Sequence, residues 1–249
     1  MSFIGTTDFF MEVAQGNIPG MSQVNKFGEN GDVAQNTTED IWDGGGTYPY
    51  PASATITHVS EVSHDANDVN MTIEVQGLDT DWALTVQTVD LHATNTSTEV
   101  ALGTPLRRIF RMKVLESIVA GENIEAHVTG GATVYAIIQA GNNQTLMSIY
   151  TIPAGKTGYV VKFYAALAAS AVRDPDSVLI RSWARDNTNG YAFQLKHSLN
   201  LDKGGTTAFE RNFGIPLRMP EKTDLRMTAY ADGADAFVSS GFDIVLIDD

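Results

Sequence analysis

The segment Gly155–Thr157 has the residue types that close a phosphate-binding loop. Such a loop has a glycine five residues before its Gly-Lys pair, and a helix follows it. Position 150 is Tyr instead, and residues 159–163 alternate in the manner of a strand. We therefore interpret residues 153–156 as a turn between two strands and not as a nucleotide site.

His58, His64, Asp65 and Asp68 bring imidazole and carboxylate donors close together in the sequence. Metal sites need such ligands on a fixed scaffold at a recognised spacing. Here the residues follow a strand into a polar loop, so we expect no metal. The chain has no cysteine, which excludes a disulfide framework, a thiolate zinc site and a cysteine nucleophile.

Two clusters of aspartate and asparagine have oxygens that suit calcium, around Asp79 and Asp81 and around Asp186. Neither follows the twelve-residue calcium loop, and turns use the same residue types. Carboxylates from different strands can meet as a glycosidase pair, although nothing in the sequence selects one. With no nucleophile elbow or dinucleotide fingerprint, we expect no enzyme and no cofactor.

Three tryptophans, Trp42, Trp82 and Trp183, and eight tyrosines are enough for a sugar-stacking platform. The same residue types are common in sandwich cores and in subunit contacts. We favour a core or interface role and keep a carbohydrate-binding sandwich as an alternative.

The charge of the chain is unevenly distributed. The net charge is -14, from 16 basic and 30 acidic residues, and residues 1–106 contain a single basic residue, Lys26. This balance argues against nucleic-acid binding, and no apolar run is long enough to span a membrane. The acidic part is either a solubilising surface or a docking face, and the cations Arg107, Arg108 and Arg111 begin where it ends.

Alternation with period two predicts roughly a dozen short strands separated by turns of Gly, Asn and Asp. A change of phase between Val86 and Val89 suggests a bulge. Helical spacing competes in residues 107–120, where β-branched residues favour a strand. The expected strands are 55–59, 71–75, 84–91, 109–115, 124–128, 133–138, 146–152, 159–165, 177–185, 191–201, 208–215, 224–231 and 237–247.

These strands predict an all-β chain of two β-sandwich or jelly-roll-like domains, residues 51–140 and 141–249, with one continuous sandwich as the competing interpretation. Residues 1–50 lack a regular period and a secretory signal, and we expect an extended N-terminal arm. Bulky residues on this arm need a surface to cover them. The candidate assembly contacts are Phe27, Ile41, Trp42, Tyr48, Tyr50, Arg107, Arg108 and Arg111.

The order of several short phrases resembles a group of virion proteins from tailed phages, common among marine ones. The phrases are FGENGDV from Phe27, EDIWDGGGTY from Glu39, EVQGLD from Glu74, IPAGKTGY from Ile152, LRMPEKTD from Leu217 and GFDIVLIDD from Gly241. Together they span most of the chain. Glu29 departs from the group, which has a basic residue at that position.

The resemblance implies a non-enzymatic particle component, assembled in the host cytoplasm and present in several copies. We expect a capsid decoration or cement protein whose arm lies across neighbouring shell subunits. Its partners would be other virion proteins, the major capsid protein first, and further copies of itself, as a trimer for example. The alternative is a neck, tail or fibre protein that contacts the host.

Overall fold

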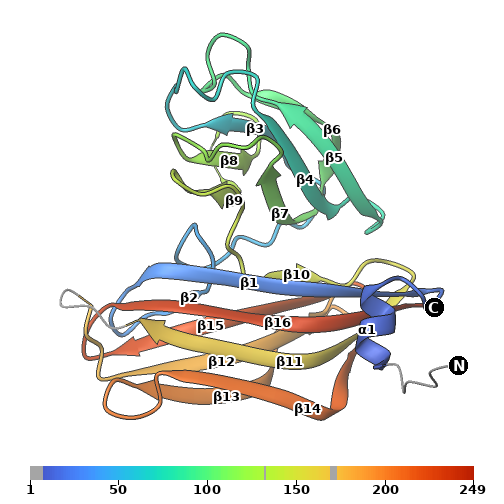
Figure 1. The fold of residues 1–249 in the computed structure, drawn as a ribbon, viewed down its shortest axis with the longest axis vertical. Helices are drawn as coiled ribbons and strands as arrows, with labels where there is room; N and C mark the ends of the chain where they lie inside the picture. The colour runs from blue at the N-terminus through green and yellow to red at the C-terminus, as the bar shows by residue number, and fades with distance from the viewer. Residues whose placement is uncertain (1–7, 132, 169–172) are drawn as a thin grey trace, which may run out of the picture.

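The computed structural model describes residues 8–131, 133–168 and 173–249 (Figure 1). Within these ranges the chain is nearly all β, with sixteen strands and one short helix, α1 (Phe9–Ala14). The expected all-β class is therefore confirmed. Asp8 caps α1 by accepting a hydrogen bond from the Phe10 N–H at 2.9 Å. No helix among the described residues is long and apolar enough to cross a membrane.

Two sheets form the larger sandwich, which lies in the lower half of Figure 1. The first sheet has the order β1 (Met21–Val33), β16 (Ala236–Asp248), β11 (Lys156–Ala168), β14 (Ala208–Met219). The second has the order β10 (Ile149–Thr151), β15 (Thr223–Asp232), β12 (Ser177–Asp186), β13 (Gln194–Asp202), and β2 (Thr38–Asp40) also pairs with β15.

The strand order of this sandwich is that of a jelly roll. β2 and β10 pair with consecutive parts of β15, at Thr228–Tyr230 and at Asp224–Arg226, and so occupy one strand position. Counted in this way, the eight positions run 1-8-3-6 in the first sheet and 2-7-4-5 in the second. That order defines an eight-stranded jelly roll of two Greek keys.

A smaller sandwich is inserted between β2 and β10. The chain leaves the jelly roll after Ile41 and returns at Ser148, whose N–H donates to the Ile41 carbonyl at 2.9 Å. Its sheets have the orders β6 (Val100–Leu106), β3 (Ile56–Glu61), β8 (Ile124–His127), β9 (Val134–Ile138) and β5 (Leu84–Asp90), β4 (Thr72–Leu78), β7 (Arg108–Val114). This inserted sandwich stands on the β1 and β10 side of the jelly roll (Figure 1).

Each sandwich has its own core, built by alternation along the strands. In β12, for example, Val178, Ile180, Ser182 and Ala184 are buried and the residues between them are partly exposed. Leu78 and Phe110 of the inserted sandwich belong to the core of the jelly roll, so the two cores meet at the junction.

The expected extended arm over residues 1–50 is wrong in its central part. Residues 21–33 form β1, which pairs with β16 from Met21↔Ile247 onward. The inward positions of β1 include Lys26, Gly28 and Asn30, so the alternation of apolar residues that identifies a strand is missing. The predicted second domain, residues 141–249, is therefore not a complete sandwich by itself. Its two sheets include β1 and β2, which come from the first fifty residues.

The predicted bulge between Val86 and Val89 is also wrong, because β4 and β5 pair in one register from Thr72↔Asp90 to Leu78↔Leu84. The change of phase has a different cause. Val89 faces the core, whereas Leu84 and Val86 lie on the opposite face and are 48% and 55% exposed. Apolar residues on both faces of one strand imitate a bulge in the sequence.

Candidate functional site

The junction between the two sandwiches contains a chain of contacts between arginines and aromatic rings. The inserted sandwich contributes Trp82, which lies 4.8 Å from the guanidinium carbon of Arg107 and 4.9 Å from that of Arg108. The Arg108 guanidinium also contacts Tyr50, with 5.3 Å between its carbon and the ring centroid. Each such contact contributes about 0.5–2 kcal/mol, more where water is excluded.

The jelly roll continues this chain of contacts. The Arg185 guanidinium lies 4.7 Å from the Tyr50 ring and 4.5 Å from the Phe193 ring, and Arg226 lies 4.1 Å from Phe193. Four arginines and three rings from both sandwiches thus form one continuous cluster, which we call the arginine–aromatic junction. Two carboxylates, those of Asp224 and Asp40, pair with it.

Asp224 is the fully buried acceptor at the centre of the junction. Its carboxylate accepts two hydrogen bonds from Arg108, at 2.8 and 3.1 Å, and two from Arg185, at 3.1 and 2.6 Å. Thr151 and Asn187 donate one each, at 2.7 and 2.9 Å. Burial alone would raise the pKa of Asp224, but the hydrogen bonds and charge of Arg108 lower it below its ordinary value. The carboxylate is fully engaged and is therefore not free to act as a general base.

The aromatic residues that precede the inserted sandwich pack into the same region. Tyr48 makes edge-to-face contacts with Trp42 and Tyr50, with ring centroids 5.1 and 4.8 Å apart. The Tyr50 hydroxyl is buried and has no hydrogen-bond partner among the described residues, and burial raises its pKa well above the ordinary value.

The structure therefore corrects four of the candidate assembly contacts. Ile41, Trp42, Tyr48 and Arg108 are between 0% and 4% exposed, so they have no surface left for a second subunit. Ile41 lies in the jelly-roll core, and the other three lie at or beside the junction. Tyr50 and Arg107 join them there. The residues selected as contacts between chains mostly connect two domains of one chain.

Phe27 and Arg111, the other two candidates, line a cleft beside the junction with a volume of about 520 Å³. Strand β1 forms one wall and strands β5 and β7 form the opposite wall. Arg111 donates a hydrogen bond to the Asn25 carbonyl across the cleft at 3.0 Å. Lys26 and Lys156 add two further cationic side chains, and no carboxylate of the described residues lines this cleft.

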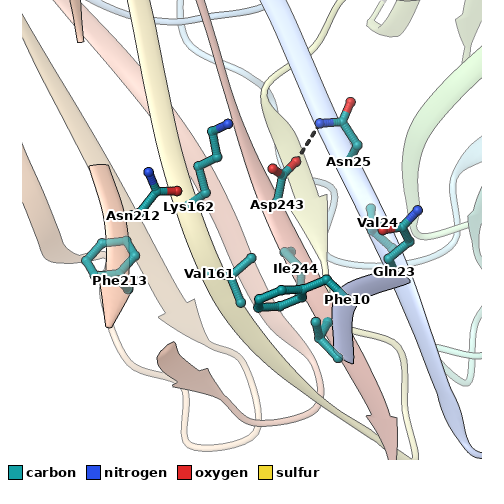
Figure 2. A pocket seen from close by; sticks show the side chains of 11 residues that line it. Phe10, Gln23, Val24, Asn25, Val161, Lys162, Asn212, Phe213, Asp243 and Ile244 are labelled. Carbon is teal, nitrogen blue, oxygen red and sulfur yellow. Dashed lines mark hydrogen bonds between the residues drawn. The ribbon is translucent and has the colours of Figure 1, made fainter. Parts of the chain in front are cut away.

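A second hollow, of about 460 Å³, lies on the outer face of the first jelly-roll sheet (Figure 2). Figure 2 shows Phe10 of α1 reaching across this face towards Val161. Asp243 accepts a hydrogen bond from Asn25 at 2.5 Å, and Lys162 pairs with Glu210 at 2.9 Å. The charged groups of this hollow are therefore already partnered within the chain.

The other sequence candidates for chemistry have structural roles. Gly155 turns the chain with a φ of +70°, and Lys156 begins β11, as the turn interpretation predicts. Asp79 accepts hydrogen bonds from the Asp81 and Ala83 N–H groups at 2.8 and 3.0 Å, as expected of a turn residue. His64 hydrogen-bonds Thr96, and no group of three His, Asp or Glu in the described ranges is arranged to hold a metal ion.

Sequence reasoning missed Asp224, Arg185 and Phe193. Asp224 follows a turn phrase and Arg185 ends a strand, both ordinary positions for a charged residue. Asp224 has the same phase as Arg226 and Thr228 in a strand whose apolar residues alternate with polar ones, so the local pattern contains no sign of its burial.

No protein-family model matches the chain, and no curated protein matches it. Among solved structures, it is similar to a structure of the infectious bursal disease virus Gt strain, at 12% identity over 97% of this chain and 78% of the other, with a TM-score of 0.22. It is also similar to the crystal structure of the infectious bursal disease virus VP2 subviral particle, at 11% identity over 96% and 77% of the two chains, with a TM-score of 0.24. The strand order alone defines the jelly-roll fold of this chain.

Proposed function

We propose that this chain is a non-enzymatic structural protein of a tailed-phage virion, which acts on the head shell as a capsid decoration or cement protein. The observation that carries the proposal is the architecture, an eight-stranded jelly roll with a second sandwich inserted in one strand position. Jelly rolls are frequent in viral particles, although lectins and cupins also use them. The order of the sequence phrases that resemble tailed-phage virion proteins adds the phage setting.

The exposed apolar residues of the jelly roll support a role in assembly. Ile215 of β14, an edge strand of the first sheet, is 86% exposed, and Leu195 of β13, an edge strand of the second sheet, is 50% exposed. Residues 213–216 have no ladder partner on β11, where the register shifts between Val160 and Lys162, so the strand bulges outward at Ile215. Large exposed apolar side chains on edge strands are typical of contact surfaces.

The N-terminal helix offers a second contact surface in place of the expected arm. Phe9, Phe10 and Met11 of α1 are 47%, 51% and 54% exposed. Phe9 and Phe10 line a hollow of about 290 Å³ whose other lining residues include Val161, Pro216 and Ile247. In this proposal these surfaces contact the major capsid protein and further copies of the chain, as in a trimer.

Copy number in the particle tests the proposal. Quantitative mass spectrometry of purified particles, with an electron-microscopy map of the same particles, should show hundreds of copies on the head. A small symmetric number, about three to twelve, on the neck, tail or fibre would support the alternative location. Absence of the protein from purified particles would overturn both.

No specific observation favours the carbohydrate-binding alternative. Trp82 is engaged with Arg107 and Arg108, and Trp42 is 4% exposed. The Trp183 indole N–H donates to the Thr228 hydroxyl at 2.9 Å on the second jelly-roll sheet. The three tryptophans therefore do not share one open face.

A further inference from the structure

Two cationic side chains of the cleft beside the junction, Lys26 and Arg111, form no ion pair in the described part of the chain, although the Arg111 charge acts on Glu74. Lys26 is 2% exposed, and its ammonium donates to the Phe110 carbonyl. An ammonium has three donors, so at least one further partner is required when it is buried and charged. No described carboxylate forms an ion pair with Lys26 or Arg111.

This lack of a counter-ion is unusual for such an acidic chain, which has 30 acidic and 16 basic residues. Burial first and the Arg111 charge second lower the pKa of Lys26 well below its ordinary value. A carboxylate in the cleft that pairs with Arg111 would offset the Arg111 charge that acts on buried Lys26. The third cation, Lys156, pairs with Asp248, which lies outside the cleft lining.

The walls of the cleft also expose apolar groups. Leu84 and Val86 of β5 are 48% and 55% exposed, and the lining on the jelly-roll side includes the apolar side chains of Val24, Phe27 and Leu246. The cleft therefore suits a segment that combines apolar side chains with one carboxylate.

The loop after β7 has this combination. Leu115, Ile118 and Val119 are 48%, 45% and 49% exposed, on the inserted sandwich. Glu116 lies between them, and its Oε1 accepts a hydrogen bond from the Thr72 N–H at 2.8 Å. Its Oε2 has no hydrogen bond within the described residues and is available to a donor from outside.

We propose that the cleft of one subunit binds the Leu115–Val119 loop of a second copy, with the Glu116 carboxylate directed at Arg111. The proposal deepens the proposed function, on which it rests, by naming a contact between subunits. Because the loop and the cleft are different patches, the contact is heterologous, and it forms closed rings where the rotation between subunits permits.

Self-association of the purified full-length protein tests this contact. Sedimentation velocity at low and high salt should show association that weakens with salt, because the contact includes an ion pair. Arg111→Glu and Glu116→Arg should each weaken association tenfold or more. The double variant, and an equimolar mixture of the two single variants, should restore it.

Two further variants separate this contact from folding and from general charge. Lys26→Met should leave the Tm of the isolated protein the same or higher, since an uncompensated buried ammonium is removed. It should weaken association less than Arg111→Glu, because Lys26 lies buried behind Arg111 and does not contact the second subunit. Lys196→Glu, which changes an exposed cation outside the cleft, should leave association unchanged. A wild-type protein that is monomeric at about 100 μM, or single variants that associate normally, would overturn the inference. Neither outcome depends on copy number in the particle, so failure here is distinguishable from failure of the proposed function.

Discussion

Replacing Asp224 with asparagine is the most direct perturbation of the arginine–aromatic junction. The two side chains have nearly the same volume, so packing is retained and the charge is lost. Asp224 is the shared acceptor of Arg108 from the inserted sandwich and Arg185 from the jelly roll. The amide introduced by Asp224→Asn would replace one acceptor oxygen with a donor that faces other donors.

The expected cost follows from the burial of the arginines. The Arg108 side chain is 4% exposed and would keep its charge without a carboxylate partner. Removal of one partner from a buried ion pair costs about 3–5 kcal/mol. The Arg185 side chain is 25% exposed, so water compensates part of its loss. For a chain of this size, we expect Tm to fall by roughly 6–20 °C.

Denaturant unfolding, followed by tryptophan fluorescence and by circular dichroism, measures this loss. A matched control is Asp248→Asn, which breaks the exposed ion pair with Lys156 and should cost only about 0–1 kcal/mol. We also expect Asp224→Asn to separate the unfolding of the two sandwiches into two transitions, because Arg108 and Arg185 lose their shared partner. The reasoning is refuted if Asp224→Asn costs no more than the control.

Three further predictions concern positions inside the fold. On β1, Gly28→Ala should lower the free energy of unfolding by about 1–3 kcal/mol, because the new methyl carbon would overlap the Ser148 backbone nitrogen. In Gly31→Ala, on the same strand, the methyl carbon meets nothing within 4 Å, so this control should be neutral in the same denaturation assay. Tyr50→Phe should stabilise the protein by about 1 kcal/mol, since it removes a buried hydroxyl without a partner among the described residues. Tyr48→Phe loses a 3.4 Å hydrogen bond to the Ile109 carbonyl and should not stabilise the protein. An equal gain in the free energy of unfolding for both variants would contradict the reasoning. Burial and the neighbouring Asp68 raise the pKa of Glu61 from 4.5 to about 7, so the folded state binds this proton more tightly than the unfolded chain. The stability that protonated Glu61 contributes is therefore present below about pH 4.5 and is lost as the pH rises to about 7. Glu61→Gln should flatten this dependence of the free energy of unfolding on pH, a change on the order of 1–2 kcal/mol after solvent screening. The exposed control Asp81→Asn should leave the pH dependence unchanged.

The sequence predicted most strands, because alternation is clear where one face of a strand is apolar. The β12 strand and the edge strand β13 lie close to their expected bounds. Prediction failed for β1, whose inward positions include Lys26 and Asn30, and for β6, where Gly103 and Pro105 interrupt the pattern. Inward polar residues have partners far away in the sequence, and a local pattern does not contain them.

The sequence identified bulky residues that need a covering surface but assigned that surface to a second subunit. Bulky residues at Trp42, Tyr48 and Tyr50 did require a covering surface, as expected. That surface belongs to the same chain, because the inserted sandwich packs on the jelly roll. The insertion point lies between β2 and β10, which share one strand position of the jelly roll. Which chain supplies a cover depends on topology, and the residues that complete the junction, Arg185 and Asp224, come more than a hundred positions later.

The pairing of β1 with β16 sets an order of folding during synthesis. Met21 pairs with Ile247, so β1 has no partner until nearly the whole described chain has left the ribosome. The strands of the inserted sandwich are all present once Ile138 has emerged. Because domains fold as units as they appear, the inserted sandwich should fold first and bring Ile41 and Ser148 together. The jelly roll then forms with Ile41 and Ser148 already side by side. The chain between β2 and β10 therefore acts as a short loop, and the entropy cost of closing it is smaller.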